Sequence, residues 1–180
     1  MAHTRPRTGD TMDIADTRTR IADDATQLVG KTPLVRLDDF APNLVAKVES
    51  FNPMSSIKDR IAVKMLDEAA EAGSVDADTT IIEPTSGNTG LGLAFACAAR
   101  DYDLVLMMPE SMTEERRSLL RALGAEIELT PADGGMNAAI DRAEELADER
   151  ENTYVPLQFE NPANPRAHRD STGPEIWEAT

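Results

Sequence analysis

Short apolar segments alternate with helical segments along most of this chain, and that alternation constrains the fold more than any other feature. Strands are predicted at residues 34–37, 44–48, 79–82, 104–108, 125–129 and 154–157. Helices are predicted at residues 16–28, 56–72, 87–100, 113–123 and 136–150. Strands joined through helices pair in parallel, so the sequence predicts an α/β fold with a twisted parallel sheet flanked by helices on both faces.

In sheets of this kind, ligands bind at the carboxyl ends of the strands, where the strand-to-helix loops meet. The loops that deserve scrutiny are therefore those after Val48, Ile82, Met108 and Leu157. Three of these four loops, those after Val48, Ile82 and Leu157, carry polar side chains of chemical interest.

An excess of acidic residues narrows the classes of partner. The chain has 33 Asp and Glu against 18 Lys and Arg, which gives a formal net charge of −15. Such a chain repels nucleic acid and anionic membranes, so neither is expected as a partner. Because the acids are dispersed, we hypothesise a protein adapted to a high-salt cytoplasm, where screening reduces self-repulsion. The alternative is an ordinary acidic enzyme.

Several features favour a cytoplasmic location. No apolar run approaches the roughly 18 residues of a transmembrane helix. The polar N-terminus does not resemble a secretory signal, and residues 1–15 are expected to form a loose tail. A single cysteine, Cys97, cannot form an internal disulfide.

The densest polar cluster is the run Glu83–Gly90, which reads EPTSGNTG and opens a very apolar helix. Exposed backbone N–H groups at such a helix start bind carboxylate or phosphate. The run lacks the Gly-Lys-Ser/Thr of a P-loop and the G-x-G-x-x-G of a dinucleotide site. A simple capped turn needs only one hydroxyl residue and one glycine, so we interpret the run as an anion site.

Two further loops supply candidate site residues. Lys58 follows two serines at the start of a predicted helix, where its amine could attack a carbonyl group; the alternative is a solvated surface lysine. Gln158 places an amide at a strand end, followed by a turn rich in proline and asparagine. By itself, Gln158 could equally satisfy a loop carbonyl.

Other notable residues are expected to be structural. Cys97 lies within an apolar helix and is interpreted as buried packing rather than as a nucleophile. His168 has no metal-ligand spacing around it, so no metal site is predicted. Trp177 is expected to pack, and the charged helix 141–150 is expected to present a solvated face.

Together these segments resemble the cysteine synthase (O-acetylserine sulfhydrylase) family of pyridoxal-phosphate (PLP) enzymes. The matching motifs, in family order, are Thr32–Val35, Asn52–Arg60, Glu83–Gly90, Met108–Glu110, Leu123–Glu126, Asn161–Pro165 and Thr172–Trp177. The resemblance runs from about residue 26 to the last residue. It implies the fold-type II, tryptophan-synthase-β-like architecture, which the family shares with cystathionine β-synthase and threonine dehydratase.

The resemblance also implies roles for individual residues. Lys58 looks like the lysine that holds PLP covalently and then acts as acid and base, and Asn88 looks like the partner of the ring hydroxyl. The residues that resemble the clamp on the substrate α-carboxylate are Thr85, Ser86, Thr89 and Gln158. The implied reaction converts O-acetyl-L-serine and sulfide to L-cysteine and acetate. Implied partners are a second copy of the chain, as a homodimer, and serine acetyltransferase.

The resemblance further divides the chain into lobes. Residues 16–43 and 156–180 are assigned to the larger lobe, and residues 44–155 to the smaller α/β lobe. Family members continue further, through a glycine-rich loop for the PLP phosphate and a partner for the pyridine nitrogen. We therefore expect a complete smaller lobe, a truncated larger lobe and an exposed apolar face. The alternatives are a cystathionine β-synthase-type β-replacement on serine, or a non-catalytic lobe that acts as a binding module.

Overall fold

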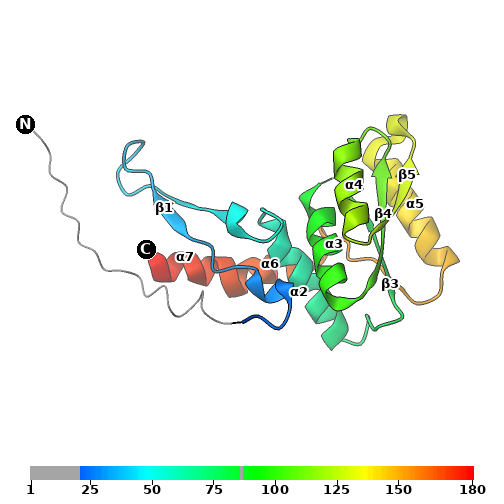
Figure 1. Ribbon diagram of the computed structural model, residues 1–180, viewed down its shortest axis with the longest axis horizontal. Helices are drawn as coiled ribbons and strands as arrows, with labels where there is room; N and C mark the ends of the chain where they lie inside the picture. The colour runs from blue at the N-terminus through cyan, green and yellow to red at the C-terminus, as the bar shows by residue number, and fades with distance from the viewer. Residues whose placement is uncertain (1–20, 86) are drawn as a thin grey trace, which may run out of the picture.

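The computed structural model describes residues 21–85 and 87–180, and it divides into two regions (Figure 1). At one end lies a parallel sheet covered by α3, α4 and α5, and at the other lies an antiparallel hairpin beside α7 (Gly173–Ala179). Helix α2 lies between the two regions. The long helices are α2 (Lys58–Glu71), α3 (Asn88–Arg100), α4 (Glu114–Ala122) and α5 (Gly135–Glu149).

The sheet confirms the predicted fold class. Its four strands are β3 (Thr80–Pro84), β4 (Asp103–Pro109), β5 (Glu126–Thr130) and β6 (Thr153–Tyr154). They are all parallel and lie in the order β5-β4-β3-β6. The central pair aligns Ile82 with Val105. Apart from Glu83, the buried residues of both central strands are apolar on both faces, as expected of a parallel sheet covered on two sides.

Two cores fill the space between the sheet and its helices. On one face, Ile82 and Val105 pack against one side of α5, through Ala139, Ala143 and Leu146. On the other face, Ile81 and Leu106 join the apolar sides of α2 and α3 in the larger core. Burying these side chains supplies the main stabilisation of the domain. Within the described residues, no helix has both the length and the apolar character needed to cross a bilayer.

The N-terminal part differs from two expectations. Strands β1 (Leu34–Arg36) and β2 (Val45–Lys47) pair with each other in an antiparallel hairpin, so the loop after Val48 does not follow a strand of the parallel sheet. The helix predicted at 16–28 is wrong for its described residues, which form only a 3-10 turn at Ala25–Leu28. Asp24 has an extended backbone and its side chain accepts from Thr26 N, so the helical turn begins only after Asp24. The tail predicted at 1–15 lies outside the described residues.

The C-terminal segment folds back along α2. It forms α6 (Ala163–Ala167), a π-helical turn (His168–Thr172) and α7 (Gly173–Ala179). The prediction that Trp177 packs is wrong: its side chain is 84% exposed, because α7 contacts the rest of the chain through the side that carries Glu175. The lobe boundaries at 43–44 and 155–156 remain predictions.

An ion cluster around the buried Arg60 joins the hairpin, α2 and α7, and we call Arg60, Glu49, Glu175 and Lys47 the Arg60 cluster. Arg60 contacts Glu49 at 2.8 Å and Glu175 at 2.7 Å, and Lys47 contacts Glu175 at 2.7 Å. Burial disfavours a charged Glu175, but hydrogen bonds from Arg60 and Lys47 outweigh it and lower the pKa of Glu175 to about 2. The cluster therefore stays ionised and fixes the C-terminal helix to the start of α2.

Candidate functional site

The polar loop between β3 and α3 is a tight turn organised by Thr85. The buried Thr85 Oγ1 accepts from the N–H groups of Gly87 and Gly90, both at 3.3 Å. A side chain at position 90 would overlap Thr85 Cγ2, so only glycine allows this approach. Because Oγ1 accepts both of these bonds, the Thr85 hydroxyl hydrogen is left to donate elsewhere. Ser86, one of the four residues assigned to the substrate-carboxylate clamp, lies outside the described residues.

Lys58 is the first residue of α2, at the end of a loop braced by two buried polar residues. Asn52 accepts from Gly30 N at 2.8 Å and donates to Ser56 O at 3.0 Å. Asp59 is fully buried and accepts from Met54 N at 2.7 Å. Burial raises the pKa of Asp59. The loop before Lys58 is thus fixed from both ends. The half-buried side chain of Lys58 takes no part in these hydrogen bonds.

The start of α2 lies directly against α3 (Figure 1). An ideal Cβ at Gly92 would stand 3.1 Å from Lys58 O and 3.1 Å from Ala62 Cβ. Asn88 lies one helical turn before Gly92, on the same side of α3. Lys58 and the exposed Asn88 are therefore carried by the starts of two helices in close contact.

Gln158 is brought to the same place from far along the chain. Thr89 Oγ1 donates to Gln158 Oε1 at 2.6 Å, and both residues are buried. The main chain turns sharply just before Gln158, where Leu157 has a φ of 50°. Asn164 Nδ2 donates to Gln158 O at 2.7 Å and fixes the other side of the turn. Thr89 and Gln158 are the pair of predicted site residues that the structure joins directly.

A residue that sequence reasoning had not singled out, Glu83, lies behind this pair. It is 1% exposed at the end of β3, and its Oε2 accepts from Leu157 N at 3.2 Å. Burial raises the pKa of Glu83 to about 7 against the effect of backbone N–H groups from Leu157 and Gln158. The sequence signal available for Glu83 is that it is a lone acid in an otherwise apolar strand. A carboxyl group that is buried in this way must find hydrogen-bond partners.

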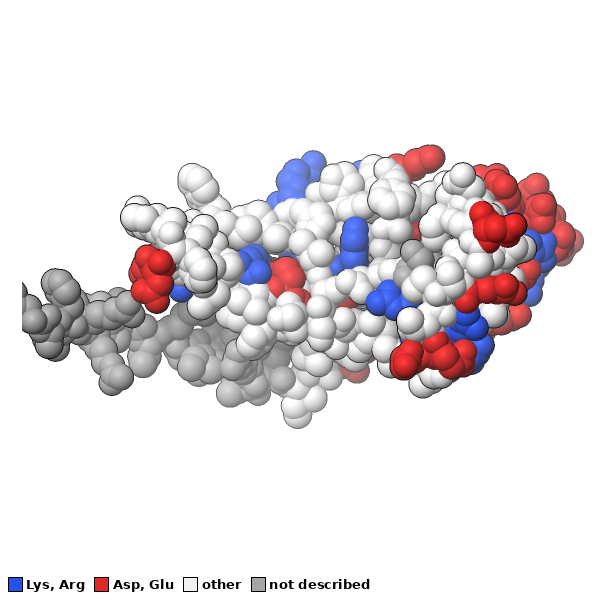
Figure 2. Space-filling view, turned by 90° about the horizontal axis from the view of Figure 1, so that it is seen from above, with Lys and Arg blue, Asp and Glu red and all other residues white. Residues whose placement is uncertain are grey.

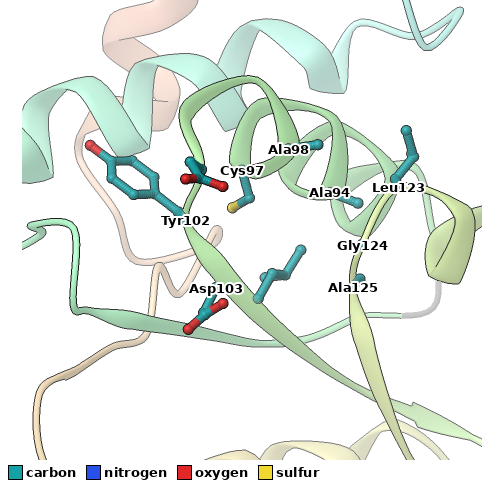
Figure 3. A pocket seen from close by; sticks show the side chains of 10 residues that line it. Ala94, Cys97, Ala98, Tyr102, Asp103, Leu123, Gly124 and Ala125 are labelled. Atoms are coloured by element: carbon teal, nitrogen blue, oxygen red, sulfur yellow. The ribbon is translucent and has the colours of Figure 1, made fainter.

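Two hollows accompany these elements. One, of about 270 Å³, lies beside Gly87 between the starts of α3 and α4. The other, of about 160 Å³, lies at the amino ends of β4 and β5, and Figure 3 shows Cys97, Tyr102 and Asp103 around it. Because it lies at the opposite edge of the sheet from the polar loop, it is separate from the candidate site. Burial raises the pKa of Cys97 to about 12, as expected of a packing residue.

The side chains that commonly bind metal ions do not cluster in the described part of the chain. Among residues 21–85 and 87–180, no group of three or more His, Cys, Asp or Glu side chains could hold a metal ion. His168 instead hydrogen-bonds Thr172 through Nδ1 at 3.0 Å. The candidate site therefore consists of an amine, hydroxyls, amides and backbone N–H groups.

Known proteins resemble this chain closely. A family model described as "Pyridoxal-phosphate dependent enzyme" matches residues 25–180. A cysteine synthase from Staphylococcus aureus is 51% identical over 158 residues, which cover 86% of this chain and 51% of that protein. The chain thus spans about half the length of the curated relatives it matches.

Solved structures agree. A hydrogen sulfide-producing enzyme from Fusobacterium nucleatum superposes with a TM-score of 0.81 at 44% identity, covering 89% of this chain and 53% of that one. Cysteine synthase from Entamoeba histolytica gives a TM-score of 0.83 at 37% identity, covering 90% and 50%. The match of the family model to most of the chain, together with these relatives, shows that the chain belongs to the pyridoxal-phosphate dependent enzyme family.

Proposed function

We propose that this chain carries the PLP lysine and the substrate-carboxylate site of a cysteine synthase, which converts O-acetyl-L-serine and sulfide to L-cysteine and acetate. The observation that carries the proposal is the Thr89–Gln158 hydrogen bond of 2.6 Å beside the helix that packs on Lys58. It joins the polar loop to the amide of Gln158, and the contact of Gly92 with Lys58 brings the lysine helix beside them, which supports a single site. The names of the relatives support the choice of reaction.

The residues present fit the cofactor. Lys47 and Lys64 are ion-paired to Glu175 and Glu68, whereas no acid among the described residues pairs with Lys58 Nζ. An unpaired amine is free to bind the aldehyde of PLP, and the exposed amide of Asn88 is free to hydrogen-bond its ring hydroxyl. When bound, PLP supplies an electron sink for the carbanion at the substrate Cα.

The chain's own residues then divide the remaining work. The Lys58 amine takes the proton from Cα and later returns it, as a general base and acid. The Thr85 hydroxyl hydrogen and Gln158 Nε2 donate to the α-carboxylate, since Gln158 Oε1 is already occupied by Thr89. Ser86 is assigned to the same clamp, and Thr89 serves it by holding Gln158 in place, because its hydroxyl hydrogen is already donated to Gln158 Oε1. Holding the carboxylate orients Cα and Cβ, where the bond to acetate breaks and the bond to sulfur forms.

A spectroscopic experiment tests the proposal. PLP added to the purified chain should give a visible absorption band that Lys58→Ala abolishes. Lys64→Ala, on the same helix, is the matched control and should keep the band. O-acetylserine should shift the band and serine should not.

Two results would count against the proposal. A wild-type chain without a band at saturating PLP would contradict the assignment of Lys58. An equal response to serine would assign a β-replacement on serine instead. A homodimer and a serine acetyltransferase partner, which the resemblance implies, belong to the same proposal for the protein, as does the cytoplasmic location that the sequence favours.

A further inference from the structure

The Glu83 carboxyl group joins the polar loop to the turn that carries Gln158. Glu83 lies two residues before Thr85, and its Oε2 accepts from Leu157 N at 3.2 Å. The backbone N–H of Gln158 is its second partner. The turn adopts a left-handed backbone at Leu157, a conformation that costs free energy for a residue with a Cβ. Hydrogen bonds from this turn to Glu83 offset that cost.

Few charged groups surround Glu83. In β4, the only charged residue is Asp103 at its far end, and in α3 it is Arg100 at its far end. From β6, Tyr154 is the titratable neighbour. Glu68 of α2, which also acts on Tyr154, is paired with Arg166 of α6.

The remaining helices place no cation in an ion pair with Glu83 among the described residues. Helix α5 packs on the opposite face of β3 and β4 through Ala139, Ala143 and Leu146. The start of α2 brings Lys58 against Gly92 of α3. In the described part of the chain, no cation forms an ion pair with Glu83, so the two backbone N–H groups are what stabilises its negative charge.

We propose that Glu83 is a positioning residue whose ionised carboxylate tightens the turn that begins at Leu157 and so holds Gln158 against Thr89. The inference rests on the proposed function in one respect, namely that Gln158 binds the substrate carboxylate. Hydrogen bonds to an ionised carboxylate are stronger than those to its neutral acid. Because burial raises the pKa of Glu83 to about 7, the turn tightens as the pH rises through neutrality.

Nuclear magnetic resonance of the whole chain tests the positioning directly. The amide shifts of Leu157 and Gln158 should move together with the Glu83 carboxyl resonance, with an inflection near pH 7. Glu83→Gln keeps the shape and one acceptor but cannot ionise, so it should abolish the inflection. His168→Gln removes the one histidine among the described residues, whose pKa is lowered by burial, and it should leave the inflection unchanged. Amide shifts that do not follow Glu83 in the wild type would overturn the proposal.

A binding measurement tests the consequence for the site. The PLP-loaded chain should bind O-acetylserine about tenfold more tightly at pH 8 than at pH 6 after correction for ionisation of the ligand. In Glu83→Gln this ratio should fall to about one. Identical pH profiles in the two proteins would refute the role of Glu83. Loss of PLP binding with an intact amide titration would instead refute the proposed function, because the titration does not depend on the cofactor.

Discussion

The contact between α2 and α3 sets the position of Lys58, and Gly92→Ala perturbs it with a single methyl group. Gly92 is buried in α3, and an added Cβ would stand 3.1 Å from both Lys58 O and Ala62 Cβ. It would also stand 3.3 Å from Lys58 C. Backbone atoms cannot rotate away as a flexible side chain can. The two helices must therefore separate by a few tenths of an ångström at Lys58.

The magnitude follows from two opposing effects. Replacing glycine by alanine within a helix favours folding by about 1 kcal/mol. Overpacking a buried contact costs about 1–3 kcal/mol, and the upper part of that range applies because two of the three close atoms belong to the backbone of Lys58. We expect Gly92→Ala to lower the free energy of unfolding by about 1–2 kcal/mol net.

Urea unfolding measures this change, with Ala98→Gly as the matched control. Ala98 is an exposed residue of the same helix, so its replacement reports helix propensity alone, a loss of about 1 kcal/mol. The displaced Lys58 in Gly92→Ala should also bind PLP more weakly, whereas Ala98→Gly should not change binding. A Gly92→Ala protein that is more stable than wild type and binds PLP equally well would refute the packing argument.

Three further predictions concern charge and reactivity. Glu175→Gln should destabilise the fold. The pKa of Glu175 is 4.5 in the unfolded chain and about 2 in the folded chain. This difference corresponds to about 3 kcal/mol of stability, which solvent screening reduces to about 1–2 kcal/mol. Because the folded pKa is the lower one, this contribution is present above about pH 4.5 and is lost as the pH falls towards 2, so urea unfolding of wild type and variant should converge in acid. Acidic side chains gather at the end formed by the parallel sheet and its helices (Figure 2), so thermal melts should show a higher Tm in about 1 M KCl than in about 0.1 M KCl; no gain would end the high-salt hypothesis. Cys97 should resist a thiol reagent until the chain unfolds, because burial raises its pKa to about 12; rapid labelling of the native protein would contradict its packing role.

The sequence predicted the regular elements well where periodicity and stop signals coincided. The predicted helices 56–72 and 113–123 correspond to α2 (Lys58–Glu71) and α4 (Glu114–Ala122), which precede Gly73 and Gly124 with positive φ. Strand pairing was harder. The runs at 34–37 and 44–48 are apolar and short. Their local sequence does not distinguish pairing with each other from pairing with the central sheet.

Part of the candidate site could be predicted from the sequence because its residues are contiguous. Thr85, Asn88 and Thr89 stand in one polar run, where local chemistry is sufficient. The partnership of Thr89 with Gln158 spans 69 positions and depends on β6 lying parallel beside β3. Glu83 stood inside the recognised run, but its partners at Leu157 and Gln158 follow from the same tertiary pairing. Local patterns cannot supply contacts that the sheet topology creates.

The central claim is that Lys58 is the lysine that holds PLP. Treating the PLP-loaded chain with borohydride fixes the cofactor to its lysine, and proteolysis with mass spectrometry then locates the label. The chain has four lysines, so the result is unambiguous. We predict a label on the peptide that contains Lys58, unchanged in Lys64→Ala and absent in Lys58→Ala. A label on Lys31, Lys47 or Lys64, or no label at saturating PLP, would contradict the account.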